Sequence, residues 1–329
     1  MVNIGIIGAG SYGEQHARAL AELTSARLAA ASRTNEAALQ QFTALYGGRG
    51  YTDYRALLAD EAVEAVVIAT PHHLHTTIVE DAARAGKHIL LEKPMAPTLA
   101  ECDRILAAVA AAGVKLMVGH TNQFARAYRT AKAILDSGEM GEVIFGLSTM
   151  SKFWFESNRR DWHLSRETGG GMWMTAGIHC LDRLTWLVGS RVSNVDAQLG
   201  TRYHQQAADD VGLIFLRYDN GAAGTVVSVG YAQGAPKHLT ELTCTNGMLN
   251  IDYVGGVTLG CDGKWQPVPD SGGENWMHEA LVNEWTAFLR MIKHDAPSPV
   301  PGEYARHIMA TVLAAEESSR LQQQVDVAP

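Results

Sequence analysis

The sequence has no long hydrophobic segment, and its first residues do not lead us to expect a secretory signal. Its longest purely apolar run covers residues 105–112, far short of the roughly 18 residues that a membrane span needs. No basic region precedes an apolar stretch at the N-terminus, so a secretory signal is not indicated. We therefore expect a cytoplasmic protein with no membrane partner.

Cysteine is scarce as well. The chain of 329 residues has 4 cysteines, which lie far apart and form neither a CxxC pair nor a disulfide framework. This usage is typical of a reducing compartment such as the cytoplasm. The four are Cys102, Cys180, Cys244 and Cys261.

Positive charge is in deficit, because 27 Lys and Arg residues face 35 Asp and Glu residues and the net charge is −8. Such a chain is a poor electrostatic partner for nucleic acid or an anionic membrane. Hydrophobic residues make up 47% and charged residues 19%, a composition that excludes a disordered or fibrous chain. At about 150 residues per domain, the length predicts two domains.

The first third of the chain alternates short apolar runs with stretches of helical periodicity. This alternation predicts βαβ units with right-handed crossovers, and hence a doubly wound parallel sheet of the Rossmann type. The apolar runs suit strands that are buried on both faces. We expect strands at residues 2–7, 28–31, 65–69, 88–91 and 115–118, and helices at 14–23, 35–46, 54–59, 75–85 and 99–112.

The pattern changes after about residue 122. Residues 194–268 are strand-like, and their Asn-Gly pairs at 220–221 and 246–247 are strong hairpin signals, because both turn residues need positive φ. The sequence therefore predicts an α/β protein with a Rossmann domain (1–121) and a C-terminal α+β domain (122–329) built on a mostly antiparallel open sheet. Helices of the second domain are expected at residues 124–137, 171–187, 279–292 and 304–321.

A GxGxxG motif connects the first expected strand to the first helix. In this context Gly8 allows a tight turn, Gly10 lets the backbone approach a pyrophosphate, and Gly13 lets the helix pack on the strand. The helix N-terminus, which includes Ser11 and Tyr12, supplies unpaired N–H groups to the phosphates. The motif predicts a dinucleotide site.

The end of the second strand indicates which dinucleotide is bound. An NAD site usually places a carboxylate there for the ribose 2′-OH, whereas this chain reads Ser32, Arg33 and Thr34. We expect Ser32 and Arg33 to hold a 2′-phosphate, so NADP(H) is favoured. The alternative is that Arg33 is a solvated surface charge and NAD(H) is also used.

Three further motifs follow in order: TPHHLH at residues 70–75, EKP at 92–94 and GGGMWMTAGIHCLD at 169–182. With the glycine turn, they make the chain resemble the Gfo/Idh/MocA oxidoreductases essentially from end to end. The resemblance implies a nicotinamide-dependent oxidoreductase of a sugar, cyclitol or related polyol. A few such proteins act on cyclic dihydrodiols or hemiacetals, and a few are glycosidases that oxidise their substrate transiently.

The resemblance also implies roles for individual residues. Lys93 would hydrogen-bond the reacting oxygen at the carboxyl end of a strand, where open sheets bind ligands, and His179 would be the general base or acid. A metal is not expected at His72, His73 and His75, which lack helical ligand spacing and an accompanying Cys or carboxylate. The residues implied to contact the cofactor are Thr70, Pro71, His72, His75, Glu92 and Lys93.

The chain departs from the family's pattern at Thr175, where relatives have aspartate. On a helix, Thr175, His179 and Asp182 would share one face. Threonine can hydrogen-bond but cannot act as a base. We therefore expect a reduced dyad of Lys93 and His179, with Thr175 positioning a substrate hydroxyl and Asp182 either tuning His179 or bracing the helix.

A second departure follows the sixth strand, where GHTNQF replaces the GHNRRF of many relatives. Asn122 and Gln123 stand in place of two cations, which weakens the case for a carboxylate gripped at this point. Arg126, Arg159 or Arg160 could replace those cations, although a solvated surface position is the preferred interpretation for each of these arginines.

Aromatic residues lie ahead of the glycine-rich helix at Trp154, Phe155 and Trp162. They either stack on the C–H face of a sugar ring or anchor the loop. The full set of expected substrate contacts is Lys93, Asn122, Trp162, Thr175 and His179.

The function expected from the sequence is reversible, NADP(H)-dependent oxidation of a secondary alcohol of a small-molecule sugar or polyol. A cyclic dihydrodiol dehydrogenase, a nicotinamide-dependent glycosidase and a non-catalytic NADP(H)-binding sensor stay open. The sensor is conceivable because of Thr175, but the intact EKP motif and His179 argue against it. Family analogy suggests a homodimer or homotetramer formed through the sheet of the second domain.

Overall fold

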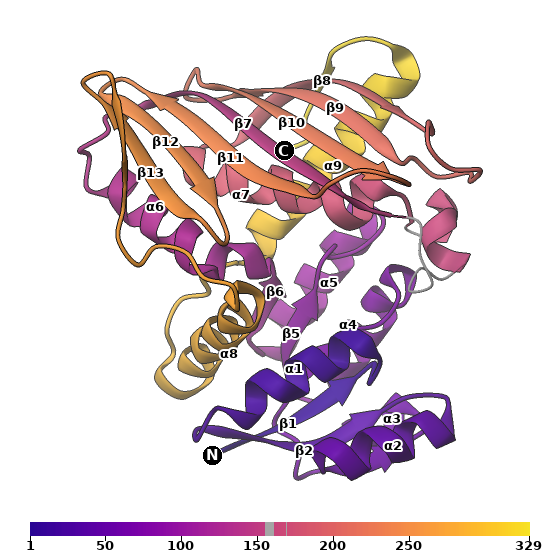
Figure 1. Ribbon diagram of the computed structural model, residues 1–329. Coiled ribbons are helices and arrows are strands. Elements are labelled where there is room, and N and C mark those ends of the chain that lie inside the picture. Colours follow the sequence, from indigo (N-terminus) through magenta and orange to yellow (C-terminus); the bar gives the residue numbers. More distant parts are fainter. Residues whose placement is uncertain (155–160, 169) are drawn as a thin grey trace. The chain divides into compact units, whose positions relative to one another are not determined.

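The computed structural model describes residues 1–154, 161–168 and 170–329, and the chain divides into two compact units (Figure 1). Unit 1 consists of Met1–Thr121 and Met277–Arg306, and unit 2 of Asn122–Trp276 and His307–Pro329. The units are not simply the two consecutive segments expected from the sequence, because residues 277–306 join the first one.

Unit 1 contains a six-stranded parallel sheet with the strand order β3-β2-β1-β4-β5-β6. The apolar runs of its central strands are buried, as expected for strands covered on both faces. The order reverses between β1 and β4, and this switch point is where open α/β sheets bind ligands. The strands are β1 (Val2–Ile7), β2 (Ala26–Ser32), β3 (Arg49–Tyr51), β4 (Ala65–Ile68), β5 (His88–Glu92) and β6 (Leu116–Gly119).

The helices of unit 1 begin and end at recognisable local signals. Asn35 accepts a hydrogen bond from the Ala38 N–H and caps α2, and Thr98 caps α5 in the same way. Gly113 ends α5 in a left-handed conformation. These helices are α1 (Ser11–Ala21), α2 (Glu36–Tyr46), α3 (Tyr54–Leu58), α4 (His75–Arg84) and α5 (Leu99–Ala112).

Helix α8 (Trp276–His294) belongs to unit 1 from Met277 onward. It buries an apolar stripe that includes Leu281, Trp285 and Phe288, spaced as one face of a helix. Its Trp285 indole donates a hydrogen bond to His16 on α1. The stripe was readable from the sequence as a helix, but its partner 269 residues away was not.

Unit 2 is built on a nine-stranded sheet with the order β14-β13-β12-β11-β7-β10-β9-β8-β15. All neighbouring strands are antiparallel except β7 and β10, which confirms a mostly antiparallel sheet. The strands are β7 (Val143–Phe153), β8 (Val192–Gly200), β9 (Val211–Tyr218), β10 (Ala223–Tyr231), β11 (Lys237–Cys244), β12 (Gly247–Asp252), β13 (Gly256–Cys261), β14 (Lys264–Pro267) and β15 (Val325–Asp326).

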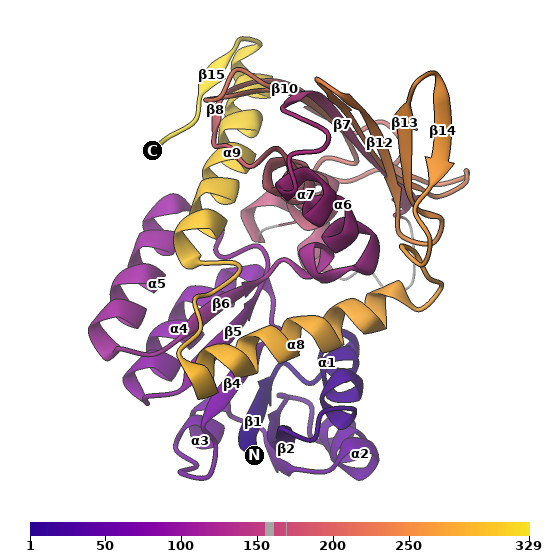
Figure 2. The same cartoon turned by 90° about the vertical axis from the view of Figure 1, so that its left-hand side faces the viewer.

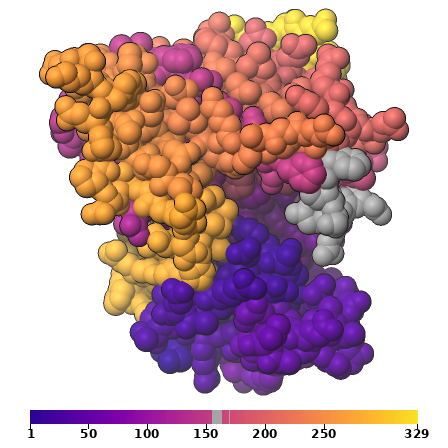
Figure 3. All heavy atoms as spheres, viewed as in Figure 1, coloured from indigo at the N-terminus to yellow at the C-terminus, as the bar shows by residue number. Residues whose placement is uncertain are grey.

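The two faces of this sheet differ. Helices α6 (Arg126–Asp136), α7 (Ile178–Val188) and α9 (Gly302–Leu321) lie on one side of it (Figure 2). Inward residues such as Ile214 and Leu242 are buried. Alternate positions on the other face leave large apolar side chains exposed, and strand residues form a broad surface toward the viewer in the space-filling view (Figure 3).

The helix expected at residues 171–187 has two parts. Trp173–Gly177 form a π-helical turn, and α7 continues from Ile178. Because a π turn is wider than an α turn, the expected α-helical spacing of Thr175 and His179 does not hold strictly. Among the described helices, none is long and apolar enough to cross a membrane.

Candidate active site

The glycine turn of unit 1 is shaped by close backbone packing. Gly8 has φ of +100°, and a Cβ there would lie 2.3 Å from the Ala69 carbonyl oxygen. A Cβ at Gly13 would lie 2.5 Å from the carbonyl oxygen of Gly8. Both positions therefore exclude any larger residue.

Gly10 is different, because a Cβ there would meet no atom within 4 Å. It is the N-cap of α1 and brings no side chain to the orphan N–H groups that include those of Ser11 and Tyr12. Open space in front of unpaired N–H groups and a helix N-terminus suits a phosphate. The residues present thus fit a dinucleotide, which would lie against this turn.

Arg33 lies beside the same turn. Its guanidinium Nη1 donates a hydrogen bond of 3.0 Å to the Ala9 carbonyl, and its backbone N–H donates to the carbonyl of Tyr51. The carbonyl of Ser32 accepts from the N–H groups of Gly8 and Ala9, and its side chain is buried. Thr34 is exposed. The half-exposed Arg33 guanidinium therefore lies next to the glycine turn.

The TPHHLH motif follows β4. The Thr70 hydroxyl oxygen is buried with no hydrogen-bond partner among the described residues, so it is available to a ligand. Pro71 is half-buried, His72 is buried at the start of a short helix, and His73 is exposed. His75 is fully buried, and its ring nitrogens lie 3.0 Å from the Thr70 carbonyl and 2.9 Å from the Pro94 carbonyl.

Lys93 and His120 follow the ends of two neighbouring strands. Glu92 and Gly119 are paired across β5 and β6, so the next residue of each strand lies at the same sheet edge. Lys93 is half-buried and His120 is buried. Burial and the nearby ammonium of Lys93 lower the pKa of His120 to about 3. His120 is therefore neutral, and no role for it was expected from the sequence.

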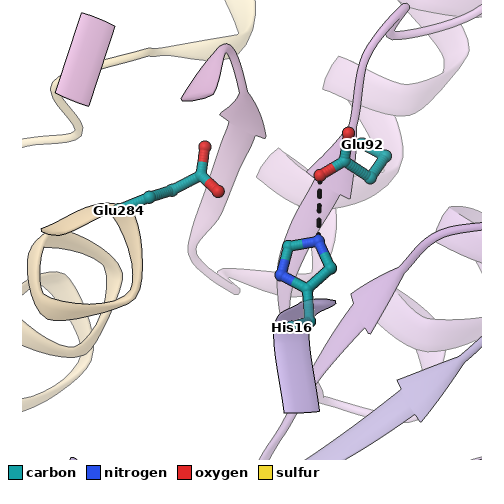
Figure 4. A group of neighbouring side chains, drawn as sticks. All are labelled: His16, Glu92 and Glu284. Carbon is teal, nitrogen blue, oxygen red and sulfur yellow. Dashed lines mark hydrogen bonds and ion pairs between the residues drawn. The ribbon is translucent and has the colours of Figure 1, made fainter. Parts of the chain in front are cut away.

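A buried cluster of His16, Glu92 and Glu284 lies beside this edge (Figure 4). His16 Nε2 lies 3.0 Å from a Glu92 carboxylate oxygen, and Glu284 reaches toward them from α8. The Thr121 hydroxyl donates to Glu284 at 3.2 Å. Sequence reasoning missed His16 and Glu284. A carboxylate on the apolar face of the helix at 279–292 was the available signal for Glu284.

The ligand atoms of this cluster lie within 4.8 Å of one another, a spacing that a metal ion could use. The donor set does not fit one. Trp285 Nε1 can only donate, and it donates to His16 Nδ1. His16 must then carry its proton on Nε2, which donates to Glu92. Neither ring nitrogen has a lone pair left for a metal.

In unit 2, Thr175 and His179 share one property. Across residues 171–185 they are the two half-exposed residues, and every other position is buried. Thr175 lies in the π-helical turn and His179 in the first turn of α7. Both side chains therefore lie at the accessible side of this otherwise buried segment.

Asp182 and Asn122 are buried. Asp182 accepts a 2.6 Å hydrogen bond from the side-chain amide of Gln123, which ties α7 to the segment that follows β6. The amide nitrogen of Asn122 has no hydrogen-bond partner among the described residues, as expected of a group that awaits a ligand.

Asp209 adds a carboxylate at the start of the π-helical turn. It accepts a 2.7 Å hydrogen bond from the Trp173 N–H. Burial raises the pKa of Asp209 to about 7; the Trp173 N–H and Arg166 oppose this rise, and Glu316 adds to it. Arg166 and Glu316 form a two-point ion pair of 2.5 and 2.6 Å. The spacing of residues in the sequence gave no signal for Asp209.

Comparison with known proteins places these elements in a family. The family model described as an oxidoreductase family with an NAD-binding Rossmann fold matches residues 2–120. The GFO/IDH/MocA C-terminal domain matches residues 128–250. The chain belongs to the Gfo/Idh/MocA family. Its N-terminal residues match the NAD-binding Rossmann fold of that oxidoreductase family.

Two named relatives and one solved structure illustrate the likeness. A 1-carboxy-3-chloro-3,4-dihydroxycyclohexa-1,5-diene dehydrogenase of Comamonas testosteroni is 36% identical over 63% of this chain, and the match spans about half of that protein, 52%. Inositol 2-dehydrogenase 2 of Saccharopolyspora erythraea is 31% identical over 70% of this chain and 68% of that protein. An NAD-binding oxidoreductase of Klebsiella pneumoniae has a TM-score of 0.90 at 25% identity, covering 100% of this chain and 99% of that one.

Phe155, Arg159 and Arg160 lie outside the described residues, as does the side chain of Trp162. Trp154 is described and buried, with its ring edge-on to His163, which is consistent with an anchoring role. Arg126 is exposed at the start of α6, as expected of a surface arginine.

Proposed function

We propose that this Gfo/Idh/MocA protein is an NADP(H)-dependent dehydrogenase that oxidises a secondary alcohol of a sugar, cyclitol or related polyol reversibly. The observation that carries the proposal is the placement of Lys93 beside neutral His120, at the sheet edge where the glycine turn opens. The inositol dehydrogenase relative supports a polyol substrate.

The proposed chemistry divides between two residues. The nicotinamide supplies the hydride acceptor for oxidation and the hydride donor for reduction. The Lys93 ammonium hydrogen-bonds the reacting oxygen and stabilises the alkoxide as the C–H bond weakens. His179, half-exposed in its buried segment, takes up the hydroxyl proton or returns it to the carbonyl.

Thr175 and Asn122 are proposed to position the substrate without moving protons. The Thr175 hydroxyl can both donate and accept a hydrogen bond, as can the Asn122 amide. Neither side chain titrates, so the dyad of Lys93 and His179 carries the proton chemistry alone. This arrangement suits a substrate that carries several hydroxyl groups.

NADP(H) is proposed as the preferred cofactor because Arg33 already lies against the glycine turn through its bond to Ala9. A guanidinium at this strand end accommodates a 2′-phosphate. The second strand ends without a carboxylate for a free ribose 2′-OH. NAD(H) would still bind through the glycine turn, so we expect a higher kcat/KM with NADP(H) and not a complete loss of activity with NAD(H).

The test is absorbance of the reduced nicotinamide with NADP⁺ and NAD⁺ against aldoses, cyclitols, polyols and cyclic dihydrodiols. Lys93→Ala is expected to lower kcat by about 100-fold or more with the best substrate. Lys115→Ala is the matched control, because Lys115 precedes β6 and pairs with exposed Asp295. Equal activity of both variants would reject the catalytic role of Lys93.

A cyclic dihydrodiol is the second candidate substrate. It is favoured by the Comamonas relative, which is named for a dihydroxycyclohexadiene substrate and is 36% identical over 63% of this chain. A ring with vicinal hydroxyls also suits hydroxyl-positioning residues such as Thr175. In the same substrate panel, a higher kcat/KM for a dihydrodiol than for every cyclitol would favour this candidate.

We also propose that the chain forms a homodimer or homotetramer through the outer face of the unit 2 sheet. On that face Phe145, Leu213 and Met248 are 37%, 53% and 45% exposed. A patch of apolar strand residues of this kind is typical of a subunit interface. Light scattering should give a multiple of the chain mass, and Leu213→Arg should reduce it. A monomeric wild type would reject the proposal.

A further inference from the structure

Two buried carboxylates share a small space in unit 1. Glu284 is 0% exposed and Glu92 is 5% exposed. An oxygen of each lies within 4.8 Å of the other and of a His16 ring nitrogen. Two negative charges at this distance in a buried site repel each other strongly, so the pair is expected to hold one proton.

The hydrogen bonds indicate which residue holds that proton. The Trp285 indole fixes His16 as a neutral ring that donates from Nε2 to Glu92 at 3.0 Å. Glu92 is thus stabilised as a carboxylate. The described hydrogen bond to Glu284 comes from the Thr121 hydroxyl at 3.2 Å, and no cation forms a described ion pair with it. Burial and neighbouring Glu92 raise the pKa of Glu284 well above its ordinary value.

The same side chains connect three elements around Lys93. Glu92 is the last residue of β5 and precedes Lys93, while Thr121 follows His120 at the end of β6. The Tyr12 hydroxyl, in the first turn of α1, lies 3.5 Å from the Thr121 hydroxyl. The Tyr12 and His16 rings pack edge to face, and so do those of His16 and Trp285.

We propose that Glu284 is a positioning residue that acts as a neutral acid, holding the ends of β5 and β6 and thereby Lys93 and His120. The proposal rests on the proposed function in one respect, namely that Lys93 is catalytic. A neutral Glu284 accepts from Thr121 without repelling Glu92. A charged Glu284 would push the two strand ends apart from α8.

The first test does not depend on activity. Unfolding exposes Glu284 to water, where its pKa returns to about 4.3 and it loses its proton at neutral pH. Wild-type stability should therefore fall, relative to Glu284→Gln, as pH rises above about 4.3. We expect the Tm advantage of Glu284→Gln to grow by more than about 2 °C from pH 5.5 to pH 8.5.

The control is Glu279→Gln, which changes a half-exposed carboxylate of the same helix. Its Tm difference from wild type should change less over the same pH range than that of Glu284→Gln, because a half-exposed carboxylate keeps contact with water in the folded protein. A constant difference for Glu284→Gln would overturn the neutral acid, because a carboxylate that is ionised in both states has no such linkage.

The second test separates positioning from general stability. Glu284→Leu removes the acceptor of Thr121, and Thr121→Val removes the donor with little change in shape. Each should lower kcat by about tenfold or more while the KM for NADP⁺ changes less than about threefold. Glu284→Gln should recover most of the kcat lost in Glu284→Leu, since it keeps a neutral acceptor. Full activity of both Glu284→Leu and Thr121→Val would overturn the positioning role.

The two proposals fail in different ways. A wild type that oxidises no alcohol would reject the proposed function and with it the positioning of a catalytic lysine, while the pH dependence of Tm would still decide whether Glu284 is a neutral acid. An active wild type with a pH-independent Glu284→Gln difference would reject the neutral acid alone.

Discussion

His75 Nδ1 lies 2.9 Å from the backbone carbonyl oxygen of Pro94. The other ring nitrogen lies 3.0 Å from the carbonyl of Thr70, so one buried imidazole joins the TPHHLH and EKP motifs. A neutral ring has one N–H and can donate to one of these carbonyls, whereas an imidazolium could donate to both. Burial lowers the pKa of His75, and the two carbonyls act against that shift.

His75→Leu should destabilise the protein by about 1–3 kcal/mol, because it leaves a buried carbonyl without its donor. The deficit should be largest above pH 6.5. A buried histidine with a lowered pKa contributes stability that is full above its unfolded pKa of about 6.5 and is lost as pH falls. Urea unfolding at pH 8 and pH 5.5 measures this.

His73→Leu is the control for that experiment, because His73 is an exposed neighbour in the same motif. It should change the free energy of unfolding by less than about 0.5 kcal/mol at either pH. A His75→Leu deficit that is equal at both pH values would contradict the lowered pKa, since the variant has no imidazole to titrate.

Arg33→Asp should reverse the cofactor preference. The change removes the cation beside the glycine turn and supplies a carboxylate for a ribose 2′-OH. The ratio of kcat/KM for NADP⁺ to that for NAD⁺ should fall at least about tenfold. The matched control is Arg27→Asp. It alters an exposed arginine of β2, the strand that Arg33 follows, and the Arg27 side chain donates a hydrogen bond to Asn3. An unchanged ratio in Arg33→Asp would reject the 2′-phosphate role.

The sequence predicted those features that depend on local pattern. The parallel strands of unit 1, the glycine turn and the Asn220-Gly221 hairpin follow from periodicity and backbone geometry, and all are present. The family resemblance then directed attention to Lys93 and His179. Neither source of information depends on which distant segments meet in space.

The sequence does not predict which distant segments of the chain pair. Glu284 meets Thr121 across 163 residues, and Trp285 meets His16 across 269. The strand Val143–Phe153 was not expected, because its partners β10 and β11 come much later in the chain. The π-helical turn at Trp173 likewise has no signature in apolar spacing, since it depends on how one turn accommodates its neighbours.

Asp182→Asn is expected to lower stability without altering the pH dependence of the reaction. The buried Asp182 carboxylate accepts a 2.6 Å hydrogen bond from Gln123 and so braces α7. Loss of its charge weakens that bond by about 1–3 kcal/mol. The pH–rate profile should keep its midpoints, because the Asp182 carboxylate is held by the Gln123 amide and acts as a brace. A displaced acidic limb would instead show that Asp182 tunes His179.

Asp209→Asn should stabilise the protein at high pH, because burial raises the pKa of Asp209 to about 7. Unfolding returns that pKa to about 3.9, so wild-type stability falls as pH rises between these values and levels off above pH 7. The Asn side chain can still accept from the Trp173 N–H. The Tm advantage of Asp209→Asn should therefore widen from pH 4.5 to pH 7 and then stay constant. Asp196→Asn, an exposed change on β8, should show no such widening. An Asp209→Asn difference that is flat across this range would mean that the carboxylate is ionised in the folded protein and caps the π-helical turn as an anion.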